Sequence, residues 1–203
     1  MATAVSQVGI VNLALSHIGQ KAITSMTDGS VQQVETSKIW DFALREALRA
    51  FNWGFAKVQA ALTVTTAYTP VVYSYAYVYP TSCVAIRKVN DEANLDNAIS
   101  GKYEVMYDIT NTLQRIVTDI KTAYIEYTYL VETVTLFDSY FVSTLARRLA
   151  AELAIPLNGD KEMAKEQIAV FNTLISEAER HNASESHEAH EGNEKSEIID
   201  ARG

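Results

Sequence analysis

Two kinds of side chain in this sequence have types and spacings that could do chemistry: paired carboxylates and clustered histidines. Glu126 and Glu132 lie close together in the chain, and a pair of carboxyl groups is what most glycosidases use to cleave a sugar chain. His181, His187 and His190 alternate with glutamates, as in some sites that chelate divalent metals. The histidine stretch offers no fixed frame, so we expect no metal there. The carboxylate hypothesis stays open, because the sequence does not set the distance between the two groups.

Other signatures of catalysis are missing from the sequence. The chain has eight glycines, and they form neither a phosphate-binding loop nor a Gly-x-Ser-x-Gly elbow. Cys83 is the sole cysteine, which excludes an intramolecular disulfide and a cysteine-rich zinc module. We therefore expect no enzyme activity, no catalytic residue, no cofactor and no bound metal.

Tyrosine is concentrated in the middle of the chain. All eleven tyrosines lie between residues 68 and 140. Four of them, Tyr73, Tyr75, Tyr77 and Tyr79, alternate along one segment, so an extended backbone would project them to one face. Tyrosine has a large apolar body and a polar tip, which suits protein interfaces, although strands favour it as well. We predict an interface at these four residues, with simple packing inside the chain as the alternative.

The C-terminal stretch, residues 181–203, is acidic and poor in large apolar side chains. Six acidic residues stand against Lys195 and Arg202, so this stretch holds half of the formal net charge of -8. It cannot bury enough apolar surface to offset the entropy lost on ordering, and we expect it to be disordered in the free protein. Its candidate binding residues are an apolar pair and the glutamates spaced three apart before it: Glu185, Glu188, Glu191, Glu194, Glu197, Ile198 and Ile199.

Apolar residues recur at helical spacing in four stretches. The predicted helices span residues 6–18, 30–51, 139–154 and 160–180. Ser30 and Gln33 match a capping box at the start of the second helix. Pro156 and the Asn158-Gly159 turn are expected to stop the third.

Between residues 55 and 135 the pattern changes to short alternating strands separated by Asn- and Asp-rich turns. The expected fold is therefore α+β: a helical bundle of about four helices with an inserted, mainly antiparallel β module and a flexible C-terminal tail. We assign residues 1–180 to a single domain and residues 181–203 to the tail.

Charge and hydropathy argue against tight binding to DNA or membranes. Apart from the tail the chain is only mildly acidic, and its adjacent basic pairs are Arg87-Lys88 and Arg147-Arg148. Neither pair supplies the concentrated basic surface that captures nucleic acid. The first nineteen residues lack a basic leader and are interrupted by polar side chains, so they fit neither a signal peptide nor a membrane span. We expect synthesis in the cytoplasm.

Several stretches, in this order, carry a resemblance to a known family. They are residues 51–56 (FNWGFA), 75–89 (YAYVYPTSCVAIRKV), 123–127 (AYIEY) and 145–154 (LARRLAAELA). Together they resemble the head-to-tail adaptor, or connector, family of short-tailed bacteriophages, the group that includes tail tubular protein A. These stretches form a fold pattern and not a catalytic motif, so the resemblance carries no catalytic residue onto this chain.

The resemblance implies a structural protein of the virion at the head–tail junction. Such a subunit forms a ring, twelvefold by family expectation, that docks under the portal protein and prolongs its DNA channel. The ring gives a platform to the next tail or nozzle protein, and DNA passes through it without tight binding. The resemblance also places the C-terminal extension against the portal. In such a ring, we expect the interface predicted at the four tyrosines to be with a neighbouring subunit or the tail. Two alternatives remain: a tail-associated cell-wall (peptidoglycan) hydrolase, and an assembly scaffold absent from finished virions.

Overall fold

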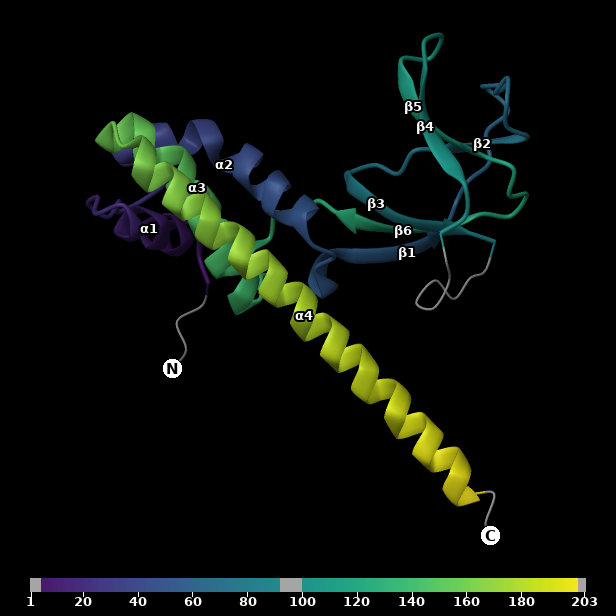
Figure 1. Ribbon diagram of the computed structural model, residues 1–203. Coiled ribbons are helices and arrows are strands. Elements are labelled where there is room, and N and C mark those ends of the chain that lie inside the picture. Colours follow the sequence, from purple (N-terminus) through teal and green to yellow (C-terminus); the bar gives the residue numbers. More distant parts are fainter. Residues whose placement is uncertain (1–4, 92–99, 201–203) are drawn as a thin grey trace. The chain divides into compact units, whose positions relative to one another are not determined.

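The chain leaves its helical part after Phe51 and returns to it at Phe137, so a β unit is inserted into a helical unit (Figure 1). The structure is a computed structural model that describes residues 5–91 and 100–200, with side chains up to His181. The fold is α+β, as predicted. The single domain expected over residues 1–180 consists of two compact units, Met1–Phe51 with Phe137–Gly203, and Asn52–Leu136.

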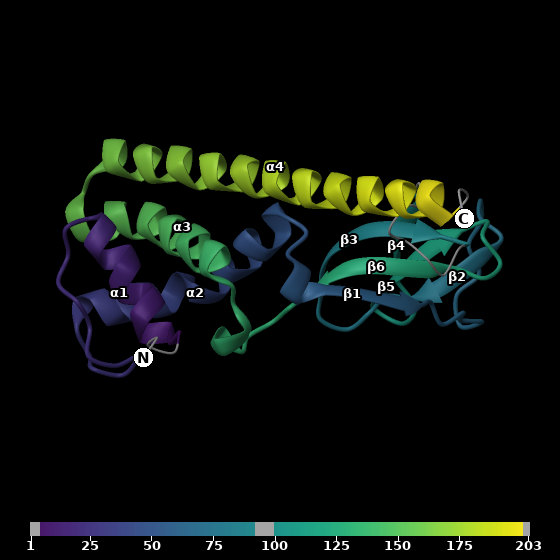
Figure 2. The same ribbon diagram turned by 90° about the horizontal axis from the view of Figure 1, so that it is seen from below.

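The helical unit is built around α3. Its helices are α1 (Gln7–His17), α2 (Val31–Ala50), α3 (Ser139–Asn158) and α4 (Lys161–Asp200). The α3 helix packs against each of the other three, because apolar and small side chains cover most of its circumference. Leu145, Leu149 and Leu153 are fully buried, together with the alanines between them. Figure 2 shows α4 lying along α3 and continuing past it.

Side-chain caps fix where these helices begin. Ser6 accepts a hydrogen bond from the main-chain nitrogen of Gly9, at 3.1 Å, before α1. Ser30 does the same for Gln33 at 3.2 Å before α2, which confirms the predicted cap. The second half of the capping box is not formed, because the main-chain nitrogen of Ser30 donates to Oδ1 of Asp28 instead, at 2.9 Å. Each cap satisfies a backbone donor that has no partner within the helix.

The third helix runs through the proline that was expected to stop it. Pro156 lies in the last turn of α3, which continues to Asn158, so the predicted end at residue 154 is wrong. The end is set instead by Gly159, which has a φ of 68° and whose main-chain nitrogen bonds to the carbonyl of Ile155 at 2.8 Å. Glycine takes this left-handed conformation without the steric cost that a Cβ adds.

The fourth helix is longer than the predicted 160–180. Its backbone is helical from Lys161 to Asp200, so the stretch expected to be a disordered tail begins as a continuation of α4. Residues 201–203 lie outside the described residues. The expected disorder concerns the free protein in solution and stays a prediction.

The β unit contains two three-stranded antiparallel sheets. One has the order β1-β6-β3, and the other has the order β2-β5-β4. A common core of aromatic and β-branched side chains includes Tyr77, Ile116, Val89 and Ile125. The strands are β1 (Lys57–Ala61), β2 (Tyr75–Val78), β3 (Cys83–Asn90), β4 (Tyr103–Asp108), β5 (Leu113–Thr118) and β6 (Tyr124–Tyr129).

Two strands differ from their sequence patterns. The segment of the four alternating tyrosines forms a strand only over β2, so Tyr73 precedes the strand, and Val71 and Val72 lie in a loop. In strand β1 the alternation of the sequence does not become a half-buried strand, because four of its five residues are exposed. Val58 is its only contribution to the common core among the described contacts.

Candidate interaction surfaces

Tyr77 in β2 is buried inside the β unit. Its side chain is 1% exposed and packs with Ile116 and Ile125. The hydroxyl lies 2.7 Å from the main-chain oxygen of Ile120 and 2.8 Å from that of Lys121, so its proton is shared between two acceptors. Burial raises the pKa of this phenol, which keeps it a neutral donor. Tyr77 therefore packs within its own chain, which agrees with the packing alternative for this residue. The interface assignment of the tyrosine row stays a prediction.

The four predicted tyrosines do not share one face. Tyr73 precedes β2 and packs in a separate small cluster beside Val117. Its hydroxyl donates to Oε1 of Glu104 at 2.7 Å, and this hydrogen bond is the main cause of its raised pKa. Because Tyr73 is also buried, intrachain packing accounts for it. Tyr75 and Tyr79 pack against the common core and are only partly buried, so an interface at these two stays a prediction.

The most exposed apolar side chains of the β unit lie on two neighbouring loops. Val71 and Val72 are 98% and 76% exposed, and Ile109 is 80% exposed. The loops touch where the amide of Asn111 donates to the main-chain oxygen of Ala67 at 3.3 Å. We call Val71, Val72 and Ile109 the apolar tip; such exposed patches mark contact surfaces. No prediction from the sequence pointed to this surface, although residues 58–86 contain no charged side chain.

A polar cluster on the β1-β6-β3 sheet surrounds Glu126. This carboxylate is 2% exposed and accepts hydrogen bonds from the amides of Asn52 and Gln59, each at 2.8 Å. The ammonium of Lys57 lies 3.6 Å from the carboxylate. Oδ1 of Asn52 is buried and has no hydrogen-bond partner among the described residues. The donors satisfy a carboxylate that would otherwise be costly to bury.

This geometry gives the hydrolase hypothesis no support. Glycoside cleavage needs two carboxyl groups that both reach the substrate. Glu132 lies on the exposed segment after β6, whereas Glu126 is enclosed and its two oxygens accept bonds from neighbouring amides. Glu126 has the contacts of a structural residue.

The helical unit has a hollow between α2, α3 and α4. Its walls include Glu46, Arg148, Ile168, Phe171 and Asn172. Glu46 and Arg148 form an ion pair with each other across it, so the charged groups in the wall serve the packing of α2 on α3. The hollow therefore shows the features of a helix junction and not those of a ligand site.

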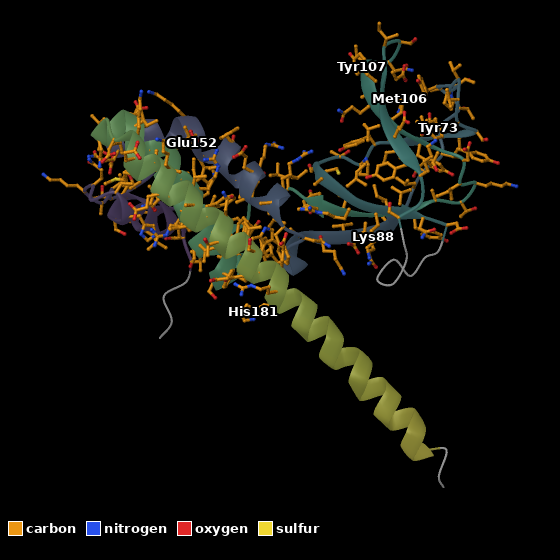
Figure 3. All side chains as sticks on the ribbon, viewed as in Figure 1. Tyr73, Lys88, Met106, Tyr107, Glu152 and His181 are labelled. Carbon is orange, nitrogen blue, oxygen red and sulfur yellow. The ribbon has the colours of Figure 1, made fainter. Side chains whose placement is uncertain are left out.

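The predicted portal-binding residues lie on the last part of α4. Glu185, Glu188, Glu191, Glu194, Glu197, Ile198 and Ile199 belong to a helical stretch of backbone whose side chains lie outside the described residues. The same holds for His187 and His190. The side chain of His181, labelled in Figure 3, is described, and its ring meets that of Tyr140 edge to face with centroids 6.4 Å apart. Within residues 5–91 and 100–181, no group of three or more metal-ligating side chains is present.

Comparison with protein-family models and with curated proteins yields no match. Among the described helices, none is both long and apolar enough to cross a membrane.

Proposed function

We propose that this chain is a structural ring subunit of a short-tailed bacteriophage, a head-to-tail adaptor that binds the portal protein. The β unit inserted into a helical unit agrees with the family resemblance of the sequence. The observation that carries the proposal is the length of α4. This helix extends well beyond α3, the helix on which it packs.

The contact between α3 and α4 reaches the first turn of α3. There the hydroxyl of Tyr140 donates to Oε2 of Glu177 at 2.6 Å, and the ring of Tyr140 meets His181 edge to face. The backbone of α4 continues as a helix to Asp200, which adds about 28 Å at 1.5 Å per residue. In Figures 1 and 2 this last part runs beyond α3.

The sequence of this projecting part does not favour a helix by itself. It contains Gly192 and Asn193 in the middle and has no large aliphatic residue before Ile198. A polar helix of this length without a packed apolar face is marginal in water. Its glutamates, spaced three apart, add repulsion between like charges. A partner with basic side chains would relieve the repulsion and supply the missing contacts.

The portal protein is that partner in this proposal. Ile198 and Ile199 anchor in a groove of the portal, and some of the five glutamates from Glu185 to Glu197 face basic portal side chains. Neighbouring copies close a ring, twelvefold by family expectation, whose channel continues that of the portal. The free face of the ring takes the next tail or nozzle protein. The chain acts by assembly in the virion and catalyses no reaction.

A deletion after Asn182 tests the proposal. We expect the truncated chain to keep the melting temperature of the full chain, because the removed part lies beyond the α3–α4 contact. Its binding to rings of the portal protein from the same phage should be sharply weaker, as seen by electron microscopy of mixtures. Full decoration of portals by the truncated chain would refute the proposal.

A matched pair of full-length variants separates anchoring from charge. Ile198→Asn with Ile199→Asn should abolish portal decoration, whereas the control Lys195→Gln should keep it. Detection of the chain in purified virions excludes the alternative of a scaffold that leaves before the particle is finished.

A further inference from the structure

Tyr140, in the first turn of α3, holds α4 at the point where α4 leaves α3. Its hydroxyl donates to Oε2 of Glu177 at 2.6 Å. This is the length of a hydrogen bond from a hydroxyl to a charged carboxylate, which is about twice as strong as one between neutral groups. The ring of Tyr140 also meets that of His181. The other oxygen of Glu177, Oε1, lies 4.0 Å from Arg180, so Tyr140 is the closer partner of this carboxylate.

The face of α4 that packs on α3 has a regular spacing of three and four residues. Its members are buried or partly buried: Ala164, Gln167, Phe171, Leu174 and Ala178. Gln167 identifies this face, because its Oε1 accepts a hydrogen bond from Arg147 of α3 at 2.8 Å. Ala178 is the last buried residue of α4 among those whose side chains are described, and it follows Glu177 directly. The Tyr140 contact therefore lies where the packing face leaves α3.

Helical register carries the packing face into the part of α4 beyond His181, where the backbone stays helical to Asp200. A helix turns by about 100° per residue, so residues seven apart lie on nearly the same side and residues eighteen apart on the same side. The residues that return to the face are Glu185, seven after Ala178, Glu188, seven after His181, Ala189, eighteen after Phe171, and Ile199, eighteen after His181. We call these four residues the prolonged face.

We propose that Tyr140 is a positioning residue for portal binding. By holding Glu177 and His181, it fixes the rotation of α4 about its own axis. The portal then contacts the prolonged face, in place of the α3 helix that covers the earlier part of the same face. This inference rests on the proposed function, and it names the side of α4 on which the portal lies.

Charge and continuity both favour the portal as the occupant of the prolonged face. The face begins with two glutamates and ends with Ile199, so it fits basic side chains followed by an apolar pocket, as the proposed function requires of the portal. A second copy has a formal net charge of -8, which opposes this docking. The face also continues an interface between packed helices, and a helix already formed up to His181 extends without a new nucleus.

Hydrogen exchange of the free full chain, read by mass spectrometry, tests the role of Tyr140 without any portal. Tyr140→Phe keeps the ring and loses the hydrogen bond, so the amides of residues 177–182 should exchange about tenfold faster. Glu177→Ala should have the same effect. Glu177→Gln should keep most of the protection, because its amide oxygen still accepts the bond. The control Glu179→Ala removes an exposed carboxylate two residues along and should leave the exchange unchanged.

A general structural role of Tyr140 would give a different pattern of exchange. The rates would then rise along the whole of α4, including residues 161–170, and that result would overturn the proposal. Unchanged exchange in Tyr140→Phe would overturn it as well. So would an equal effect of Glu177→Ala and Glu179→Ala, because the loss of any carboxylate would then be enough.

A matched pair of alanine substitutions tests which side of α4 the portal contacts. Ala189→Trp adds a large side chain to the prolonged face, whereas Ala183→Trp adds it about 140° around the helix from Ala178. In binding titrations against portal rings, Ala189→Trp should weaken the affinity about tenfold, and Ala183→Trp should leave it unchanged. Tyr140→Phe should weaken it too, although Tyr140 lies outside the prolonged face.

Equal effects of the two tryptophans would overturn the assignment of the face. Self-association of the free chain that Ala189→Trp abolishes would also overturn it, because a second copy would then occupy the prolonged face. An unmodified chain that binds no portal ring would refute the proposed function and the portal as occupant. The exchange experiment would still decide whether Tyr140 positions α4, so the two failures are distinguishable.

Discussion

Arg148 on α3 donates from Nε to Oε2 of Glu46 on α2 at 2.5 Å. The same guanidinium lies 2.6 Å from Oε1 of Glu152, one turn along α3, and 5.4 Å from the ring centre of Phe42. The Arg148 side chain is nearly enclosed, at 11% exposed. It therefore joins two helices that the inserted β unit separates in sequence, and it neutralises two neighbouring carboxylates.

Replacing Arg148 with methionine should destabilise the helical unit. The two carboxylates would lose their shared donor and repel each other, which costs about 1–3 kcal/mol. Urea denaturation followed by circular dichroism measures the loss. The control is Lys165→Met, because the Lys165–Glu162 pair is almost fully exposed and such pairs contribute about 0–1 kcal/mol. Equal effects of the two substitutions would contradict the structural role of Arg148.

Asp108, at the end of β4, gives the β unit a predicted dependence on pH. Its Oδ2 accepts hydrogen bonds from the amide of Asn111 at 2.8 Å and from Nε of Arg115 at 3.1 Å. These bonds, that of Asn111 first, lower the pKa of Asp108 against the opposing effect of burial. The pKa is thus lower in the folded state than in the unfolded state, where the pKa of an aspartate is about 3.9. The stabilisation is complete above the unfolded pKa and is lost as the pH falls through the folded pKa.

Asp108→Asn should reduce this acid sensitivity. Trp53 belongs to the β unit and is buried, so its fluorescence, in a Trp40→Phe background, reports the unfolding of that unit. We expect the free energy of unfolding to fall as the pH drops below about 4 in the parent and to fall less steeply in Asp108→Asn. Parallel profiles of the two proteins would show that Asp108 does not carry the effect.

Tyr77→Phe tests whether the tyrosine row is used for packing inside the chain. Removing the hydroxyl leaves the buried carbonyls of Ile120 and Lys121 without this donor, which costs about 1–3 kcal/mol. Chemical denaturation of the free chain measures that loss. Tyr107→Phe is the control, because Tyr107 is largely exposed and surface changes of this kind stay within about 0.5 kcal/mol. A stable Tyr77→Phe chain would return Tyr77 to the candidates for an interface.

The elements with local signals could be predicted from the sequence. Apolar spacing located the four helices, and Ser30 marked the start of α2 because a cap is a contact between near neighbours. The end of α3 could not be predicted from Pro156 alone. A proline in the last turn clashes only with the preceding turn, and the packing of α3 on three helices overrides that cost.

The interaction surfaces could not be predicted in the same way, because they depend on contacts between residues that are far apart in the sequence. Alternation placed Tyr73 and Tyr77 on one face, but the strand begins only at Tyr75, so the chain turns between them. Whether Tyr77 is buried depends on Ile116 and Ile125, which are remote in sequence. The pairing of β4 with β5 depends on strand order, which alternation alone cannot give.

The channel of the proposed ring should not hold DNA. Half of the formal charge of -8 lies in residues 181–203, so the rest of the chain is mildly acidic as well. Binding to a duplex needs several basic side chains at the phosphates. Each phosphate contact releases a counterion, so such binding weakens as the salt concentration rises. We expect no binding of a duplex DNA by the full chain below about micromolar concentration at physiological salt, measured by fluorescence anisotropy.

The chain truncated after Asn182 has lost the acidic tail and is the control for repulsion by that tail. It should bind no better, because DNA must slide past the inner wall without being held. Submicromolar binding by either protein would contradict a neutral or acidic channel wall.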